Sequence, residues 1–277
     1  MSVVAASLAA VAFGAGDFFG GVAARRSSWR VVVPAALGMG LLVLGVADYF
    51  FGDASGTASP PMMWCLCAGF GLAIGLSLLY RALAEGRMTE VAPITAIVAI
   101  AIPAVVDIVL GKTVTLTLIL GLVLACASAA LLSGLSGRGS KPRDRSSLLI
   151  AIGAGASLAV FYIGLDQISA ANAGVHGVLI VRVVAFVSTA VFALGQARSA
   201  FQLRSFAWAT GAGLFDGAAN LLLAQAFIDG GLAETSAIAS LYPGSTILLA
   251  IAFLGERPSK IQYAGLALAV PAIFLLR

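Results

Sequence analysis

The chain has 277 residues, of which 61% are hydrophobic and only 10% are charged, and its formal net charge is +4. Its mean hydropathy of +1.06 excludes an ordinary soluble domain, which needs far more polar surface. The basic residues gather in short segments between apolar runs, so the positive charge does not indicate a nucleic-acid-binding surface.

Apolar runs follow one another almost without pause, and each has about the 20 residues that a helix needs to cross a bilayer. We therefore predict an all-α integral membrane protein with ten transmembrane helices and little else. No Lys or Arg precedes the first run, so a cleaved secretory signal is not expected. The predicted helices cover residues 2–24, 29–51, 61–84, 90–110, 114–134, 147–168, 174–195, 205–228, 234–254 and 259–276.

The first helix carries Asp17, an acid well inside an apolar run that also holds Gly16 and Gly20. Ionisable groups at this depth are costly and usually face the bundle interior or a wet cavity. The functional interpretation is a carboxylate that binds a cation or a proton. The structural alternative is an Asp paired with Arg25, Arg182 or a helix end.

The third and fourth helices bring a tyrosine, a proline and an acid. Tyr80 could offer its hydroxyl to a cavity or lie in an interfacial aromatic belt, and the same holds for Tyr162 and Tyr242. Pro103 removes a backbone hydrogen bond inside the fourth helix and is a candidate for a break. Asp107, near the end of that helix, is expected to reach toward the interface.

The least apolar segment, residues 136–146, is short, basic and rich in Gly and Ser, which predicts a linker. It separates a first repeat, residues 1–135 with five helices, from a second, residues 147–277 with five more. Because five is odd, the second half must enter the membrane from the opposite side. The repeats are therefore expected to be inverted.

In the second half, Arg182 is the one basic residue far from a helix end, and it could attract an anionic substrate group or neutralise an intramembrane Asp. Asp216 and Asn220 stand four residues apart, which places both on one helix face. They could bind an amine, a hydroxyl or a proton, or they could join helices by hydrogen bonds. Pro243, followed by Gly244, should weaken the ninth helix near its middle, where transporters place their sites.

The two halves also match in sequence. A shift of 144 residues without a gap places Trp64–Ala125 on Trp208–Ala269, with 15 identities in 62 positions. The tryptophan pair carries more weight than the many Ala, Leu and Gly coincidences. An internal repeat in a membrane chain is typical of transporters, whose sites lie between the repeats.

Loop charges differ between the two sides of the membrane. The segments that join helices 1–2, 3–4, 5–6, 7–8 and 9–10 hold 13 of the 16 basic residues, whereas the opposite side holds Lys112 and Arg277. This bias predicts a cytoplasmic basic side and both termini outside.

Several motifs resemble a known family. Val91-Ala92-Pro93-Ile94 with Leu110-Gly111, and Ser240-Leu241-Tyr242-Pro243 with Leu254-Gly255-Glu256-Arg257, are similar to repeat motifs of the drug/metabolite transporter superfamily, EamA type. The segments around Asp17 and Asp216 resemble a bacterial branch of it, which implies the bacterial inner membrane. Lys112 departs from the Glu that the family has there, and the family usually keeps both termini in the cytoplasm, against the charge bias. The resemblance implies that helices 1, 3, 4, 6, 8 and 9 surround a substrate cavity.

Enzymatic chemistry has little support. His176 is the single histidine, and Cys65, Cys67 and Cys126 lie in apolar runs, so neither a metal site nor a cofactor is expected. The sequence predicts a secondary transporter of a small metabolite, amino acid or drug, with export as the favoured direction. Proton coupling at Asp17 or Asp216 is preferred, because the chain carries no ATP-binding module.

Two other functions stay open at this stage. One is translocation of a lipid or a lipid-linked head group, and the other is a scaffold or receptor subunit that transports nothing. The expected partners are a small-molecule substrate and membrane lipid. A monomer is sufficient to enclose a cavity, and a dimer is the alternative.

Overall fold

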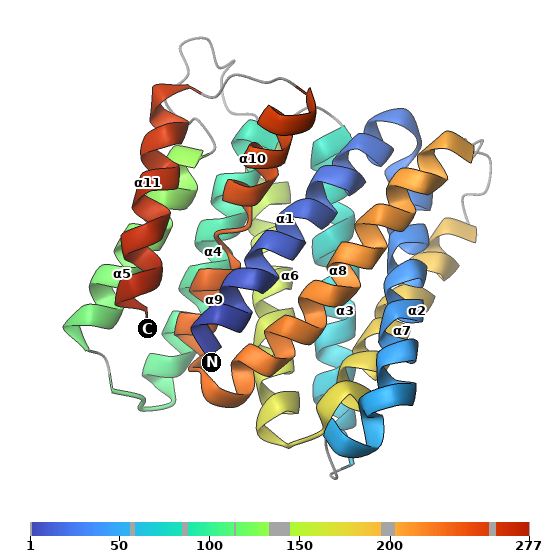
Figure 1. Ribbon diagram of the computed structural model, residues 1–277, viewed down its shortest axis with the longest axis horizontal. Helices are drawn as coiled ribbons and strands as arrows, with labels where there is room; N and C mark the ends of the chain where they lie inside the picture. Colours follow the sequence, from blue (N-terminus) through green and yellow to red (C-terminus); the bar gives the residue numbers. More distant parts are fainter. Residues whose placement is uncertain are drawn as a thin grey trace.

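A computed structural model describes residues 2–55, 59–84, 88–113, 115–132, 145–194, 203–254 and 259–276. Within these residues the chain forms eleven α-helices and no strand (Figure 1). The helices are α1 (Ser2–Arg26), α2 (Trp29–Ser55), α3 (Met62–Ala84), α4 (Met88–Val109), α5 (Leu116–Leu132), α6 (Arg145–Ala170), α7 (Gly174–Leu194), α8 (Leu203–Asp229), α9 (Leu232–Ala239), α10 (Pro243–Leu254) and α11 (Lys260–Leu275).

The helices follow the predicted apolar runs, and the ninth run contains two of them, α9 and α10. Seven helical stretches in the described residues are long and apolar enough to cross a membrane, one of them formed by α9 and α10 together. Shorter apolar helices lie at Ile94–Val109, Leu116–Leu132 and Lys260–Leu275. The all-α membrane class is thereby supported, whereas ten complete crossings stay a prediction. Of the predicted linker, residues 136–144 lie outside the described residues, and α6 already begins at Arg145.

Large apolar side chains cover much of the outer surface, which is the arrangement a lipid environment favours. Val109, Leu194 and Phe274 are 78%, 75% and 69% exposed. Small residues lie inside instead, among them many fully buried alanines. Since lipid tails are as apolar as Leu, helices in a membrane associate through close packing of such small residues rather than through water exclusion.

The helices of the first half pack mainly against helices of the second half. Helix α1 lies along α8, α3 lies along α6, α2 contacts both α7 and α8, and α5 pairs with α11 (Figure 1). Glycines permit the close approach of α8 to α2. A Cβ added to Gly213 would lie 2.7 Å from the Cβ of Met39, and one added to Gly217 would lie 3.1 Å from the Cα of Gly40. The interior between the two halves is therefore built from interleaved helices.

The ninth predicted helix is interrupted in the bundle interior. Helix α9 ends at Ala239, residues 240–242 form a turn, and α10 begins at Pro243. Proline suits a first helical position because the N–H it lacks would have no partner there. By contrast, α4 continues through Pro103 without an interruption.

The turn between α9 and α10 is held against α1 by hydroxyl groups. Thr246 Oγ1 donates to the carbonyl of Gly14 at 3.0 Å, and Ser245 Oγ donates to the carbonyl of Ala10 at 3.1 Å. A side chain at Gly14 would collide with Ser245 and with the backbone of Tyr242. The glycine therefore lets α1 approach the interruption.

Candidate functional site

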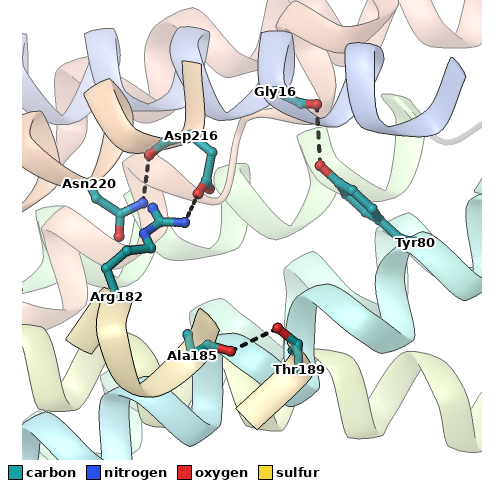
Figure 2. A network of polar contacts seen from close by, with 7 residues as sticks. All are labelled: Gly16, Tyr80, Arg182, Ala185, Thr189, Asp216 and Asn220. Carbon is teal, nitrogen blue, oxygen red and sulfur yellow. Dashed lines mark hydrogen bonds and ion pairs between the residues drawn. The ribbon is translucent and has the colours of Figure 1, made fainter. Parts of the chain in front are cut away.

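Arg182 of α7 and Asp216 of α8 form an ion pair in the bundle interior (Figure 2). Only 1% of the Arg182 side chain and 9% of the Asp216 side chain are exposed. The guanidinium has room because Gly40 of α2 carries no side chain, and a Cβ there would lie 3.1 Å from Arg182 Cζ. Because an unpaired buried charge is costly, each of the two side chains stabilises the other.

Asn220 lies one turn after Asp216 on α8. Its Nδ2 donates to the backbone carbonyl of Asp216 at 2.7 Å, as Figure 2 shows. The spacing of four residues places both on one face, as predicted, but the amide contacts the backbone rather than the carboxylate. The carboxylate of Asp216 is consequently left to Arg182.

Asp17 lies on α1 and is 9% exposed. No hydrogen bond or ion pair of its carboxylate occurs within the described residues, and Arg182, one of its expected partners, is paired with Asp216 instead. Asp216 is near enough to repel Asp17 electrostatically. A buried carboxylate in such a setting favours the uptake of a proton or a cation, because either removes an uncompensated charge.

Three tyrosines from different helices lie around Asp17. Tyr80 of α3, Tyr162 of α6 and Tyr242 after α9 are 1%, 3% and 5% exposed, and each is within electrostatic reach of Asp17. The Tyr80 hydroxyl donates to the carbonyl of Gly16 at 3.4 Å (Figure 2). An interfacial belt would require exposure at the surface, and these residues are inside the bundle.

The structure thus brings six of the predicted site residues into one cluster between the two halves. They are Asp17, Tyr80, Tyr162, Arg182, Asp216 and Tyr242, and Asn220 adjoins them through the backbone of Asp216. Pro243 lies at the start of α10, next to Tyr242. Pro103 lies inside α4, which is continuous through it.

Sequence reasoning missed the hydroxyl residues near the helix interruption. Thr235, Ser236, Ser240 and Thr246 are all buried, and Ser240 lies beside the Tyr162 side chain. These small polar residues pass unnoticed in an apolar run, since each can bond to its own helix backbone. Their concentration on both sides of Pro243 is the signal that could have revealed them.

The expectation for Asp107 was wrong. Its side chain does not extend to the interface but is buried, with 4% of the residue exposed. One carboxylate oxygen accepts the N–H of Ala233, and the other lies beside Lys112. The described residues contain no group of three or more His, Cys, Asp or Glu side chains placed to hold a metal ion.

Comparison with known proteins supports the resemblance that the motifs indicate. The model of the EamA-like transporter family matches residues 145–277. A solved chain, described as "Crystal structure of protein", is similar over 99% of this chain and 94% of its own, with a TM-score of 0.78 and 12% identity. At that identity the likeness shows the fold alone. No curated protein matches the sequence. The second half of the chain, residues 145–277, is thus similar to the EamA-like transporter family.

Proposed function

We propose that the protein is a secondary transporter that moves a small metabolite, amino acid or drug across the bacterial inner membrane. Transport is the role of the family whose model matches residues 145–277. The observation that carries the proposal is Asp17, a buried carboxylate with no polar partner within the described residues, placed between the two halves of the bundle. We take export as the direction.

The helix pairs support two inverted repeats that rock against each other. In this arrangement α1, α2 and α3 correspond to α6, α7 and α8, α4 corresponds to α9 with α10, and α5 corresponds to α11. The α1–α8 pair then corresponds to the α6–α3 pair. Both pairs are extensive in the structure, and the corresponding α2–α8 and α7–α3 pairs are also present. An interface made of equivalent halves can open at either end at similar cost, which is the requirement for alternating access.

Asp17 is better suited than Asp216 to exchange a proton or cation during the cycle. Asp216 is bound to Arg182, and releasing it would leave a buried guanidinium without a partner. Asp17 has no such partner to abandon. The coupling we propose is therefore a proton taken up by Asp17 on one side of the membrane and released on the other.

The cluster fits a small amphipathic substrate. Three tyrosine rings offer apolar faces and hydroxyl groups, while Asp17, Asp216 and Arg182 together carry one net negative charge when all are ionised. A primary or secondary amine beside an apolar group would match both properties. Because all of these residues come from one chain, a monomer suffices.

The test is a comparison of metabolites inside and outside cells that overproduce the wild type, Asp17→Asn or Asp216→Asn at equal membrane levels. Asp229→Asn is the matched control, since Asp229 is exposed at the end of α8 and takes no part in the cluster. We expect one class of compound to be redistributed by the wild type and by the control, and not by Asp17→Asn.

The other outcomes have distinct meanings. If no soluble compound moves but the lipid composition of the two leaflets changes, the substrate is a lipid. If nothing changes with the wild type, the scaffold function gains support. Equal movement by Asp17→Asn and the wild type would contradict the assignment of the site.

A further inference from the structure

The buried carboxylate of Asp107 links the two halves of the chain outside the cluster around Asp17. It lies near the end of α4, where its Oδ2 accepts the backbone N–H of Ala233 at 2.7 Å and its Oδ1 lies 2.7 Å from Lys112 Nζ. Ala233 belongs to the first turn of α9. The first N–H groups of a helix have no partner within it, and the N-cap residue Gly231 supplies no side-chain acceptor. Asp107 therefore supplies from the first half an acceptor that the second half lacks.

Helix α9 connects this contact to the candidate site. It has only eight residues, about 12 Å at the usual rise per residue, and it ends at the turn that holds Ser240 and Tyr242. Tyr242 lies within electrostatic reach of Asp17. A displacement of the beginning of α9 is thus passed along a short rigid rod to the residues around Asp17.

The contact lies at the end of the bundle that holds the N-terminus of α1, the α4–α5 connection and the α8–α9 connection (Figure 1). A second polar contact between the halves lies at the ends of α2 and α7, where Asp48 Oδ2 is 3.3 Å from His176 Nδ1. The end of the bundle that holds both contacts, together with the N-terminus of α1, is called the terminal end below. Two pairs of helices, one member from each half, are joined there by polar side chains.

The internal repeat shows that the contact of Asp107 is built on one half only. With the shift of 144 residues, Asp107 corresponds to Ile251 and Lys112 corresponds to Glu256. Isoleucine cannot accept a hydrogen bond, so this position of the second half cannot hold the beginning of α4 in the same way. The asymmetry distinguishes the two ends of an otherwise repeated architecture.

A cavity lies beside the contact. A cavity of about 260 Å³ lies between α4, α5 and the beginning of α9, lined mainly by apolar residues with Asp107, Lys112 and Glu234 among them. Burial lowers the pKa of Lys112, but its hydrogen bond to Asp107 and the charges of Asp107, Asp166 and Glu234 raise that pKa above its ordinary value overall. Lys112 therefore keeps its charge at neutral pH, and α9 has room to move once the contact is released.

We propose that Asp107 is a positioning residue that holds α9 against α4 and so keeps the two halves of the bundle together at the terminal end in the resting transporter. Release of Ala233 from Asp107 is the step that opens this end. The proposal rests on the alternating access proposed above, but it concerns the balance between two conformations and not the substrate.

The test measures distances between spin labels at two exposed positions, Val109 of α4 and Ile228 of α8. Val109 follows Asp107 by two residues, and Ile228 precedes Ala233 by five. Asp107→Leu removes the acceptor and the charge, Asp107→Asn keeps an acceptor oxygen, and Lys112→Met removes only the ion pair. Asp229→Asn, an exposed acid at the same end, is the matched control. We expect Asp107→Leu to raise the ratio of long to short distances at least tenfold, Asp107→Asn to raise it less, and the control to leave it unchanged.

Hydrogen exchange of α9 supplies a second readout. Faster exchange in α9 alone, with other helices unchanged, is expected for Asp107→Leu, whereas a merely structural role would speed exchange throughout the bundle. If Asp107→Leu does not fold, the proposal is tested by the same label distances in Asp107→Asn and Lys112→Met. An unchanged distance ratio in a folded Asp107 variant would overturn the proposal. The distances are measured without substrate, so they test the role of Asp107 even if the transport experiment fails.

Discussion

The ion pair between Arg182 and Asp216 provides the sharpest test of the interior geometry. Replacing Arg182 by Met leaves the Asp216 carboxylate buried, with 9% of its side chain exposed, and without its charged partner. Removing one member of a buried pair typically costs about 3–5 kcal/mol. At roughly 2–3 °C per kcal/mol for a chain of this size, the melting temperature should fall by about 6–15 °C.

The double variant Arg182→Met/Asp216→Asn separates this cost from lost packing. It leaves no buried charge at the pair, so it should be more stable than either single variant. Its loss of unfolding free energy should be smaller than the sum of the two single losses by about 2 kcal/mol or more. Thermal unfolding in one detergent is measured for the purified wild type, the two single variants and the double variant. Additive losses, with the double variant the least stable, would refute a direct buried ion pair.

Three further predictions concern single positions. Gly20→Ala should push Tyr80 away from Gly16, because the added Cβ would run into the Tyr80 ring, at a cost of about 1–3 kcal/mol and with loss of transport. Gly45→Ala, with nothing within 4 Å, should not lower the melting temperature, since Ala suits a helix interior better than Gly, and should leave transport unchanged. A hydrophobic carbodiimide takes up the proton of a protonated carboxyl group, whose oxygen then adds to the carbodiimide carbon. The reagent should therefore modify Asp17 and spare the paired Asp216, and mass spectrometry showing the reverse would contradict the site. Ser259→Ala removes the capping box that begins α11 and should cost about 1 kcal/mol without changing transport, so a loss of transport at unchanged stability would count against a purely structural role.

Much of the helical framework could be predicted from the sequence. A membrane helix forms its backbone hydrogen bonds internally and is visible in the sequence as a long apolar run. The same logic identified Asp17, Arg182 and Asp216, since each is an ionisable residue inside such a run. The tyrosines were identified as candidates, but only the structure distinguishes burial around Asp17 from exposure in a belt.

The partners could not be predicted, because they depend on how distant helices pack. Nothing in the sequence chooses Asp216 over Asp17 as the counter-charge of Arg182, and only the structure shows that Arg182 lies beside Gly40 and pairs with Asp216. The contact of Asp107 with a backbone N–H has no sequence signal either, since Ala233 contributes only its amide. Pro243 indicated weakness in the ninth helix, but a proline pattern cannot show that Ser245 and Thr246 would bond to α1.

The most direct test of Asp17 as the coupling group uses the protein reconstituted in liposomes, with the compound identified in the cellular comparison. Exchange of labelled for unlabelled compound is measured without a pH gradient, and net movement is measured with one, for the wild type and Asp17→Asn. We predict that a pH gradient drives net movement by the wild type, and that Asp17→Asn exchanges the compound but no longer responds to the gradient. Net movement that follows the gradient equally in both proteins would contradict the account.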